Sequence, residues 1–451
     1  MLSTFAPQGW LCRVTSARER IGEAAIGSPS LGNYFAKYLD LEWRYPPMKT
    51  GTILTLVLTL ASCLSAYAQS ESVLHSFSGG DGEYPLSALT YDPATHAYYG
   101  TSQQGGTLKG GTVFKLVQNS SGNWLFSRIY QFPATSTDGS MPWGVRLVAI
   151  DNGGALSALY GTTEYGGTNN LGTAFQLTPG VGGTWNETML YSFSGPDGQW
   201  PLGGLVSDGK GSLYGMTNYG GTNNTGTVYQ LKQVNGAWQQ RVLLSLGGNY
   251  GGYPAGSLLV GKGGVLYGAT DLGVVSGHGT AFQLTPPQPG SNQWTATVLH
   301  TFAGGTADGA NPNCDLTIDA TGSIYGTTST GGANNGGIVF QLSPGSAGWT
   351  FNILYSFTGG ADGQNPGAGV IFDDAGNLYG TVPYAGPYFG GAVYKLTPGS
   401  SSWTESSLWT FGGSGDGVGP FSGLLKKNGA LFGTTQDGGT SNKGVIYSVV
   451  P

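Results

Sequence analysis

The sequence predicts an all-β protein, a seven-bladed β-propeller with four antiparallel strands in each blade. The segment Leu-Tyr-Gly-Thr-Thr, or a close variant, recurs seven times at spacings of 53 to 61 residues. A fixed period of this kind is typical of propellers, solenoids and arrays. Each repeat contains four short apolar runs, and the two ends of the repeat region supply complementary strands. The glycine of the recurring segment is Gly100, Gly161, Gly215, Gly268, Gly326, Gly380 or Gly433.

The third repeat illustrates how one unit divides into strands. Its four runs are rich in Val, Thr, Tyr and Leu and are bounded by Gly, Asp and Asn, which is typical of strands and turns. The runs are 201–206, which starts at a proline, then 213–217, 227–231 and 238–246. Between the first two runs lies a tight turn, in which Asp bonds its own backbone and Gly supplies a positive φ. The turn recurs as 208–211, 319–322 and 374–377.

The ends of the repeat region explain how the ring closes. Residues 73–77 match the fourth strand of a repeat, whereas the end of the chain, 445–448, matches the third. The last repeat, which starts at Pro420, therefore lacks a fourth strand that the N-terminal segment can provide. Pairing the two segments closes the propeller and removes two open sheet edges. We expect the N-terminal strand to complete the last blade.

Small and large side chains are expected at opposite ends of each blade. Strands crowd together near the axis of a propeller, so small residues such as Gly203, Gly204 and Gly369 are expected there. Large rings fill the wider outer gaps between blades. A tryptophan begins the fourth strand of six repeats, and we interpret all six as core residues: Trp124, Trp185, Trp238, Trp294, Trp349 and Trp403.

The region before the repeats predicts export. Residues 48–68 contain a basic start, an apolar stretch and a small-residue cleavage site, which is the pattern of a signal peptide and too short for a membrane span. Residues 1–47 fit no fold and are interpreted as a mis-assigned or disordered extension. Residues 69–451 then form one propeller, secreted, periplasmic or held at the cell surface. An alternative is a lipoprotein signal, in which Cys63 carries the lipid anchor.

Composition excludes several kinds of function. Processing after residue 68 leaves 12 basic and 20 acidic residues, a net charge of −8. Nucleic-acid binding relies on Lys and Arg and is not expected from such a chain. Only Cys314 would remain, so the mature chain has no internal disulfide and no cysteine cluster for a metal. We predict no cofactor, no metal site and a monomer.

The repeated elements resemble the GloVer tandem-repeat family of exported bacterial proteins. The resemblance covers residues 73–451 and rests on the Leu-Tyr-Gly-Thr-Thr segment and on the Gly-Thr-Val-Tyr or Gly-Thr-Val-Phe segment that follows it. It implies secretion and a propeller-like fold, with anchoring that varies among members, and it implies no activity. A looser similarity to kelch repeats, which also combine a glycine pair with a later tryptophan, supports the fold alone.

No catalytic constellation stands out from the repeat. Asp-Gly pairs recur in six repeats and could form a ring of carboxylates for a cation, but turn chemistry is needed in every blade and explains them better. Of the four histidines, His75 and His300 take the place of Tyr191 and are interpreted as strand residues between blades, and His96 lies in a hairpin. Cys314 is interpreted as a buried thiol. The Asp-Gly aspartates are Asp81, Asp138, Asp197, Asp308, Asp362 and Asp416.

Candidate ligand-binding residues are those that break the repeat on one face. The loops from strand four to strand one and from strand two to strand three share a face, and binding residues favour such loops. Exposed rings there suit stacking on sugars or anchoring of a protein, whereas the alternative is packing between blades. The candidates are Tyr84, Trp143, Arg146, Trp200, Tyr253, His278 and Tyr388, with Tyr384 and Phe389 in the same loop as Tyr388.

Two classes of function fit these residues. The first is a non-enzymatic binding module for a carbohydrate or a cell-envelope protein, which the scarcity of charge and histidine favours. The second is a propeller hydrolase or lyase of the lactonase or esterase type, with acids near the central channel. Because one scaffold serves both roles, the fold does not separate them. A purely structural envelope protein is a third reading, and it predicts a featureless loop face.

Overall fold

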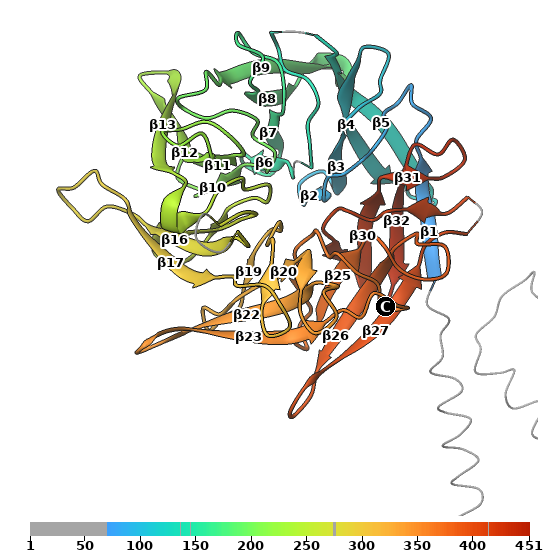
Figure 1. Cartoon of the computed structure of the whole chain (residues 1–451). Helices are drawn as coiled ribbons and strands as arrows, with labels where there is room; N and C mark the ends of the chain where they lie inside the picture. The colour runs from blue at the N-terminus through green and yellow to red at the C-terminus, as the bar shows by residue number, and fades with distance from the viewer. Residues whose placement is uncertain (1–69, 136, 145, 274–276, 414) are drawn as a thin grey trace, which may run out of the picture. The chain divides into compact units, whose positions relative to one another are not determined.

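A computed structural model describes residues 70–451 except 136, 145, 274–276 and 414. The predicted signal peptide at 48–68, the extension at 1–47 and Cys63 lie outside the described residues. The described part contains seven four-stranded antiparallel sheets, set around a common centre as the blades of a propeller (Figure 1). The predicted fold class is confirmed. Within this part, no helix is long and apolar enough to cross a membrane.

The strands of blades 1 to 4 follow the chain from the centre outward. Blade 1 consists of β2 (Thr90–Asp92), β3 (Ala97–Ser102), β4 (Lys109–Gln118) and β5 (Trp124–Pro133). Blade 2 consists of β6 (Val148–Asp151), β7 (Leu156–Thr163), β8 (Thr173–Pro179) and β9 (Trp185–Ser192). Blade 3 consists of β10 (Val206–Ser207), β11 (Ser212–Thr217), β12 (Thr227–Val234) and β13 (Ala237–Ser245). Blade 4 consists of β14 (Leu259–Val260), β15 (Leu266–Thr270), β16 (Thr280–Thr285) and β17 (Thr295–Thr301).

Blades 5 to 7 complete the ring. Blade 5 consists of β19 (Thr317–Ile318), β20 (Ile324–Thr328), β22 (Ile338–Gly345) and β23 (Gly348–Ser356). Blade 6 consists of β24 (Ile371–Phe372), β25 (Leu378–Val382), β26 (Ala392–Pro398) and β27 (Trp403–Thr410). Blade 7 consists of β29 (Leu425–Lys427), β30 (Ala430–Thr435), β32 (Val445–Val450) and β1 (Ser70–Ser76). Short pairs and turns join them: β18 (Gly309–Ala310) with β21 (Thr330–Gly331), β28 (Gly417–Val418) with β31 (Asp437–Gly438), and η1 (Val181–Gly183), η2 (Gly248–Tyr250) and η3 (Lys262–Gly264).

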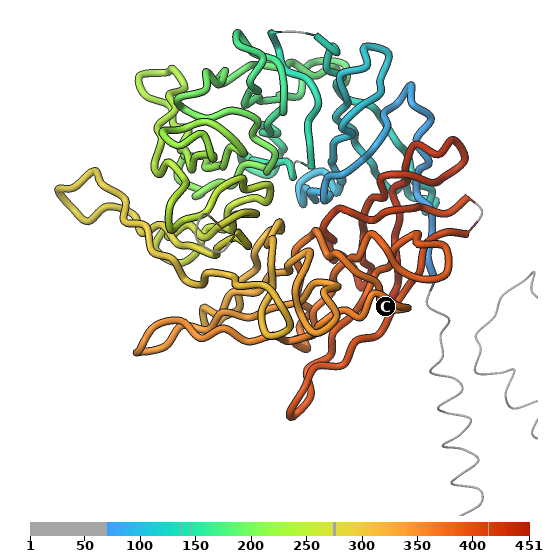
Figure 2. Tube along the Cα trace, in the orientation of Figure 1, coloured from blue at the N-terminus to red at the C-terminus, as the bar shows by residue number. Residues whose placement is uncertain are grey.

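The ring closes through the two ends of the propeller, as predicted. Strand β1 pairs antiparallel with β32, from Ser70 opposite Val450 to Ser76 opposite Val445. Figure 2 shows the blue start of the described chain running beside its red end. A side-chain hydrogen bond adds to the closure, because the Thr434 hydroxyl of blade 7 donates to the Ser87 carbonyl before blade 1 (3.1 Å). Blade 7 is thus built from both ends of the sequence.

The innermost strands are shorter than predicted. The predicted strand 201–206 joins its sheet only from Val206 onward, as β10. The preceding residues instead pack against the inner segments of the adjacent blades. A Cβ atom on Gly203 would lie 2.3 Å from the Gly256 carbonyl oxygen, and one on Gly204 would lie 2.6 Å from the Arg146 carbonyl oxygen. Crowding at the centre therefore explains why glycines occur here and why the residues before Val206 do not pair with the next strand.

The predicted hairpin turns are present, with one correction. The Asp208 side chain accepts hydrogen bonds from the Lys210 and Ser212 backbone N–H groups (2.7 and 3.0 Å). In blade 6 the sequence predicts this role for Asp374, but the structure gives it to Asp373. Asp373 Oδ1 accepts from the backbone N–H groups two and four residues later, both at 2.9 Å. The turn therefore begins one residue earlier than predicted, at 373 instead of 374, because Asp373 is the residue that closes it.

The glycine and the first threonine of the recurring segment each have a structural task. In blade 2, Gly161 lies directly opposite Phe175 of the next strand. A Cβ atom on Gly161 would be 2.6 Å from the Phe175 Cζ atom and 2.9 Å from the Leu147 side chain, so no larger residue fits. The Thr162 hydroxyl donates to the Gly203 carbonyl (3.1 Å), which ties blade 2 to blade 3. The same glycine–aromatic opposition recurs in every blade, with Phe114, Tyr229, Phe282, Phe340, Tyr394 and Tyr447.

Replacing Gly161 by alanine is expected to destabilise the protein by about 1–3 kcal/mol, because the added methyl group overpacks a closed core. Gly80 is the matched control, since nothing lies within 4 Å of a Cβ atom there and its φ is ordinary. Gly80→Ala should leave the thermal unfolding midpoint unchanged or slightly raised. Circular dichroism melts of both variants test this. Equal midpoints for the two variants would contradict the packing role of Gly161.

The six recurring tryptophans pack between blades, as predicted. All six are partly buried against hydrophobic clusters. The Trp185 ring of blade 2 meets Tyr99 of blade 1 at a centroid distance of 6.0 Å, and Trp238 of blade 3 meets Tyr160 of blade 2 at 6.0 Å. These rings join neighbouring sheets, which is the role expected of large side chains away from the centre.

Candidate binding site at the channel mouth

Seven equivalent residues line the centre of the propeller. Each directly precedes the buried Leu or Val at the start of a blade, such as Leu147 in blade 2 or Leu316 in blade 5. Five of the seven are Gly, Ala or Ser, and only two carry charge. In chain order the seven are Ala88, Arg146, Gly204, Ser257, Asp315, Gly369 and Gly423. The repeat therefore breaks twice at its most crowded point, with one cation and one anion.

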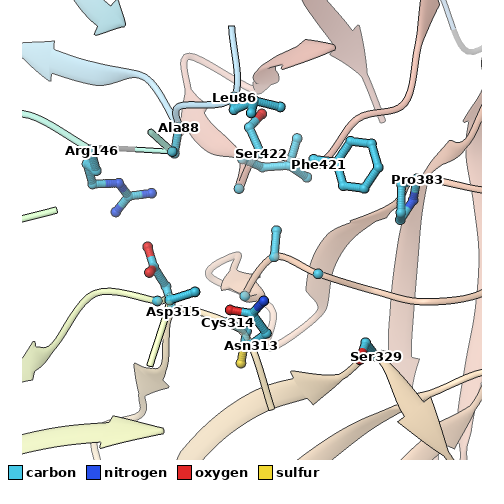
Figure 3. A pocket seen from close by; sticks show the side chains of 18 of the residues that line it. Leu86, Ala88, Arg146, Asn313, Cys314, Asp315, Ser329, Pro383, Phe421 and Ser422 are labelled. Carbon is cyan, nitrogen blue, oxygen red and sulfur yellow. The ribbon is translucent and has the colours of Figure 1, made fainter. Parts of the chain in front are cut away.

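Arg146 and Asp315 face each other from opposite walls of the opening (Figure 3). Asp315 is held in place because its Oδ1 atom accepts the Ser257 backbone N–H at 2.7 Å. The Nε atom of Arg146 is buried and lacks a hydrogen-bond partner among the described residues. None of the ion pairs found within the described ranges involves either residue. Both charged groups thus have hydrogen-bonding capacity left for a ligand.

The two charges lie in the wall of a cavity of about 490 Å³, a size within the range of small-molecule sites. Three aromatic rings line it, those of Trp143, Tyr384 and Phe421. Amide and hydroxyl groups lie between the rings, and one Arg and one Asp give the wall no net charge. The amide and hydroxyl residues are Gln103, Asn313, Ser329, Asn365 and Gln436, with Thr317 and Ser422.

The lining offers binding groups rather than a pair of catalytic acids. Asp315 is the one carboxylate, and no histidine occurs, among the described residues that line the cavity. General acid–base catalysis by two carboxyl groups needs a second such group within reach. No group of three or more His, Cys, Asp or Glu side chains suited to a metal occurs in the part of the chain that the structure describes.

Cys314 also borders the cavity but serves the fold, as its interpretation as a buried thiol predicts. Its Sγ atom accepts the Thr327 backbone N–H and approaches the Thr327 carbonyl oxygen, both at 3.2 Å. Ser87 and Ser422 make the same two hydrogen bonds in their own blades. Burial raises the pKa of the Cys314 thiol to about 11, which opposes formation of a nucleophilic thiolate.

The Asp-Gly aspartates hold loops together, which confirms the turn interpretation where their contacts are described. Asp308 accepts the Ala303 backbone N–H (2.9 Å) and hydrogen-bonds His300 of the fourth strand (3.1 Å). Asp81 does the same with the Ser78 N–H and His75. Rings from the next blade stack on these histidines, with centroids 3.7 Å apart for His75 and Phe126, and 4.1 Å for His300 and Phe351. Asp197, Asp362 and Asp416 bond Tyr191, Tyr355 and Trp409 in the same way.

The structure brings together two of the seven predicted site residues, Trp143 and Arg146. Three others contact neighbouring side chains on the loop face. The Trp200 ring lies between Tyr165 and Tyr219, at centroid distances of 5.9 and 5.0 Å. Tyr253 packs on Tyr219 at 5.0 Å, and the Lys443 ammonium lies 5.7 Å from the ring of Tyr84. These three side chains therefore pack between blades, which is the alternative to ligand binding that the sequence left open for the aromatic candidates.

The last two candidates lie apart from the cavity lining. His278 anchors a loop through its carbonyl oxygen, which accepts the Asn311 backbone N–H at 2.9 Å. Tyr388 is 74% exposed in the loop between β25 and β26. Sequence reasoning missed Asp315, Asn313 and Phe421 as site residues. Comparing the residue before each inner Leu or Val across the seven repeats would have revealed Asp315, because that comparison isolates the two charged residues.

The repeats of this chain match a known family model. The model of the Gloeobacter/Verrucomicrobia repeat matches residues 123–317 and 288–451. The chain belongs to this family. No curated protein is detectably similar in sequence. Among solved structures, a proposed 6-phosphogluconolactonase of Bacteroides uniformis has a TM-score of 0.45 and 13% identity, covering 72% of this chain and 83% of that one.

A protein of unknown function from Dyadobacter fermentans is similar to the same degree. Its TM-score is 0.43 and its identity 11%, over 84% of this chain and 96% of that one. TM-scores below 0.5 carry no information about activity.

Proposed function

We propose that this family member is an exported, non-enzymatic propeller that binds carbohydrate in the cavity at its channel mouth. The observation that carries the proposal is the combination of Arg146, Asp315 and three aromatic rings in the lining of one cavity. A sugar hydroxyl both donates and accepts hydrogen bonds, and the cavity offers groups of each kind. Asp315 accepts, Arg146 donates, and the amides of Asn313 and Gln103 do both.

The aromatic rings complete this complementarity. A sugar ring has apolar C–H faces between its hydroxyl edges, and a flat aromatic ring covers such a face while its neighbours bond the edges. Trp143 is 38% exposed and Tyr384 is 42% exposed, so both rings are open to a ligand. Large aromatic rings with polar groups between them, in a small cavity, suit a sugar better than a purely apolar molecule.

Charge favours a neutral sugar. The charges of Arg146 and Asp315 cancel within the cavity wall, and the chain as a whole carries a net charge of −6. An anionic glycan would meet the repulsion of an acidic protein, which lowers both its association rate and its affinity. A neutral hexose or pentose meets no such penalty.

A glycan-array screen of residues 69–451 tests the proposal. Trp143→Ala is expected to weaken binding to any neutral glycan retained by the native chain by about tenfold, because a stacked ring and its buried area are lost. Trp200→Ala is the matched control, since that ring packs on Tyr165 and Tyr219 and does not line the cavity. It should keep the array signal. A native chain that binds no glycan, or equal losses in both variants, would overturn the proposal.

A further inference from the structure

Several bulky side chains at left-handed backbone positions lie on one loop face. Outside asparagine and glycine, a positive φ is rare for large residues and costs conformational energy. Among the described non-glycine residues with positive φ, eight are Asn, the residue that tolerates this region best. The other seven are His96 in the hairpin from β2 to β3, Lys109 at the blade 1 position equivalent to Phe389, and five residues in the loops of the face described above: Tyr84, Met141, Trp200, Tyr253 and Phe389, with φ of 52° to 60°.

Phe389 differs from the aromatic members of this group in its contacts. The rings of Tyr84, Trp200 and Tyr253 each contact a neighbouring ring or a lysine, which offsets the cost of their backbone conformation. Phe389 is 66% exposed and makes no ring contact among the described residues. The adjacent Tyr388 is 74% exposed. Two consecutive residues therefore carry largely exposed rings, one of them on a strained backbone.

The other blades show what this loop needs for folding alone. The residue equivalent to Phe389 is Asn170 in blade 2, also with positive φ, and its Oδ1 atom accepts the Gly166 backbone N–H at 3.0 Å. Phe389 keeps the same turn, since its N–H donates to the Gly386 carbonyl (3.2 Å), but its side chain cannot form the asparagine bond. Asn224, Asn335 and Asn442 form that bond in blades 3, 5 and 7. Phenylalanine is thus the poorer residue for the fold.

The exposed rings belong to the same loop as one wall of the cavity. Tyr384, in the loop from β25 to β26, lines the cavity, and its ring lies 5.8 Å from that of Phe421, which also lines it. Tyr388 follows four residues later, so its Cα atom lies at most roughly 14 Å from that of Tyr384. Along this loop Tyr384 lies at the cavity, and Tyr388 and Phe389 follow it in the chain.

We propose that Tyr388 and Phe389 form an outer subsite on which further sugar units of a neutral oligosaccharide stack, while its inner unit occupies the cavity. This inference rests on the proposed function and adds that the ligand is a chain. Two rings bury roughly 150–250 Å² each. Together they fall below the roughly 800 Å² per partner of a stable protein interface. Flat, uncharged rings next to a hydroxyl-binding cavity suit a polysaccharide.

The variant Phe389→Asn separates binding from folding, because asparagine is the residue that four other blades use here. Its thermal midpoint should equal or exceed that of the native chain. Its affinity for a bound hexasaccharide should fall about fivefold with the loss of one stacked ring, while its affinity for the matching monosaccharide stays unchanged. The probes are cellohexaose, xylohexaose and mannohexaose in calorimetric titrations, with glucose, xylose and mannose in ligand-observed NMR. Tyr388→Asn is the second variant and should behave alike.

The results of these titrations either support or overturn the outer subsite. Hexasaccharide affinity that is unchanged in both variants would overturn the outer subsite and leave the proposed function intact. An equal loss for the monosaccharide would also overturn it, since the rings would then belong to the inner site. A native chain that binds none of the three hexasaccharides but retains other glycans on the array would overturn the proposal that the ligand is a chain of these neutral sugars. Trp143→Ala distinguishes the inner site, because it should lose the monosaccharide and the hexasaccharide together.

Discussion

Removing strand β1 (Ser70–Ser76) should abolish the cooperative thermal unfolding of the propeller. Without it, β32 (Val445–Val450) becomes an unpaired edge and the buried side chains of Ile446 and Tyr447 lose their cover. The strand also joins blade 7 to blade 1, since His75 stacks on Phe126 with parallel rings. The combined loss is expected to exceed about 5 kcal/mol, which is comparable to the whole stability of an ordinary domain.

A permuted chain separates loss of the strand from loss of its position in the sequence. Ser70 lies opposite Val450, so a two-residue turn can join the end of β32 to the start of β1. Blade 3 makes this connection naturally through Asn235 and Gly236, both with positive φ, between Val234 and Ala237. A chain that begins at residue 77 and ends with 450, Asn-Gly and 70–76 should melt cooperatively near the midpoint of a chain that begins at Ser70.

Calorimetry on three chains tests the role of β1: one beginning at residue 70, one beginning at 77, and the permuted chain. A sharp transition near the native midpoint in the chain that begins at 77 would show that blade 7 does not need β1. Failure of the permuted chain alone would show that the added turn, rather than the strand pairing, is at fault. A fourth chain with a Gly-Ser turn in place of Asn-Gly then shows whether the Asn-Gly turn itself causes the failure.

The sequence predicted those parts of the fold that recur in every blade. The four strands of each blade, most of the turn aspartates and the β1–β32 pairing follow from local chemistry and from counting strands, both of which a repeat displays many times. The centre of the ring was less predictable. Arg146 and Asp315 are 169 residues apart, and only ring closure places them on opposite walls of one cavity.

Deciding between packing and binding also required the structure. Trp200 and Phe389 both break the repeat, and nothing in the sequence separates them. Their surroundings do, since Trp200 contacts two tyrosine rings whereas Phe389 is largely exposed. The sequence can therefore show where a repeat is broken, and the neighbours of each broken position show whether the change serves the fold.

The second large prediction concerns pH, because three equivalent glutamates lie between blades beside an aspartate. Four residues after each glutamate comes the ring that hydrogen-bonds the aspartate of an Asp-Gly loop. The glutamates are Glu71, Glu187 and Glu405, and the rings are those of His75, Tyr191 and Trp409, respectively. The Oε1 atom of each is buried and has no hydrogen-bond partner among the described residues. Burial raises the pKa of each to about 7, helped by the charges of Asp416, Asp138 and Asp362, respectively.

These raised pKa values make the folded protein more stable in mild acid. A carboxyl group whose pKa rises from 4.5 to about 7 on folding contributes stability that is complete below pH 4.5 and is lost as the pH rises to 7. Because the groups are only half-buried, solvent screening reduces the effect to about 1 kcal/mol each. The melting midpoint should then fall by roughly 5 °C between pH 5 and pH 8.

Below pH 4 the trend reverses through other carboxylates. Burial alone would raise the pKa of Asp81, but hydrogen bonds from His75 and Ser78 lower it to about 2. In Asp373, hydrogen bonds from Asn377 outweigh burial and likewise lower the pKa to about 2. Stability from these groups is present above about pH 4 and is lost as the pH falls through 2. Maximum stability is therefore expected near pH 4.5.

Blade 3 supplies the control for the glutamates, since it has Gln240 at the same place. The Gln240 Nε2 group donates a hydrogen bond to the Asp197 carbonyl at 3.0 Å, so an amide is accommodated there without a charge. The triple variant Glu71→Gln, Glu187→Gln, Glu405→Gln should melt at nearly the same temperature at pH 5 and pH 8, and above the native chain at pH 8. A variant that loses stability between pH 5 and pH 8 as steeply as the native chain would place the pH dependence elsewhere. A flat profile would assign it to these three side chains, whose protonation removes buried negative charge and its repulsion by the neighbouring aspartates.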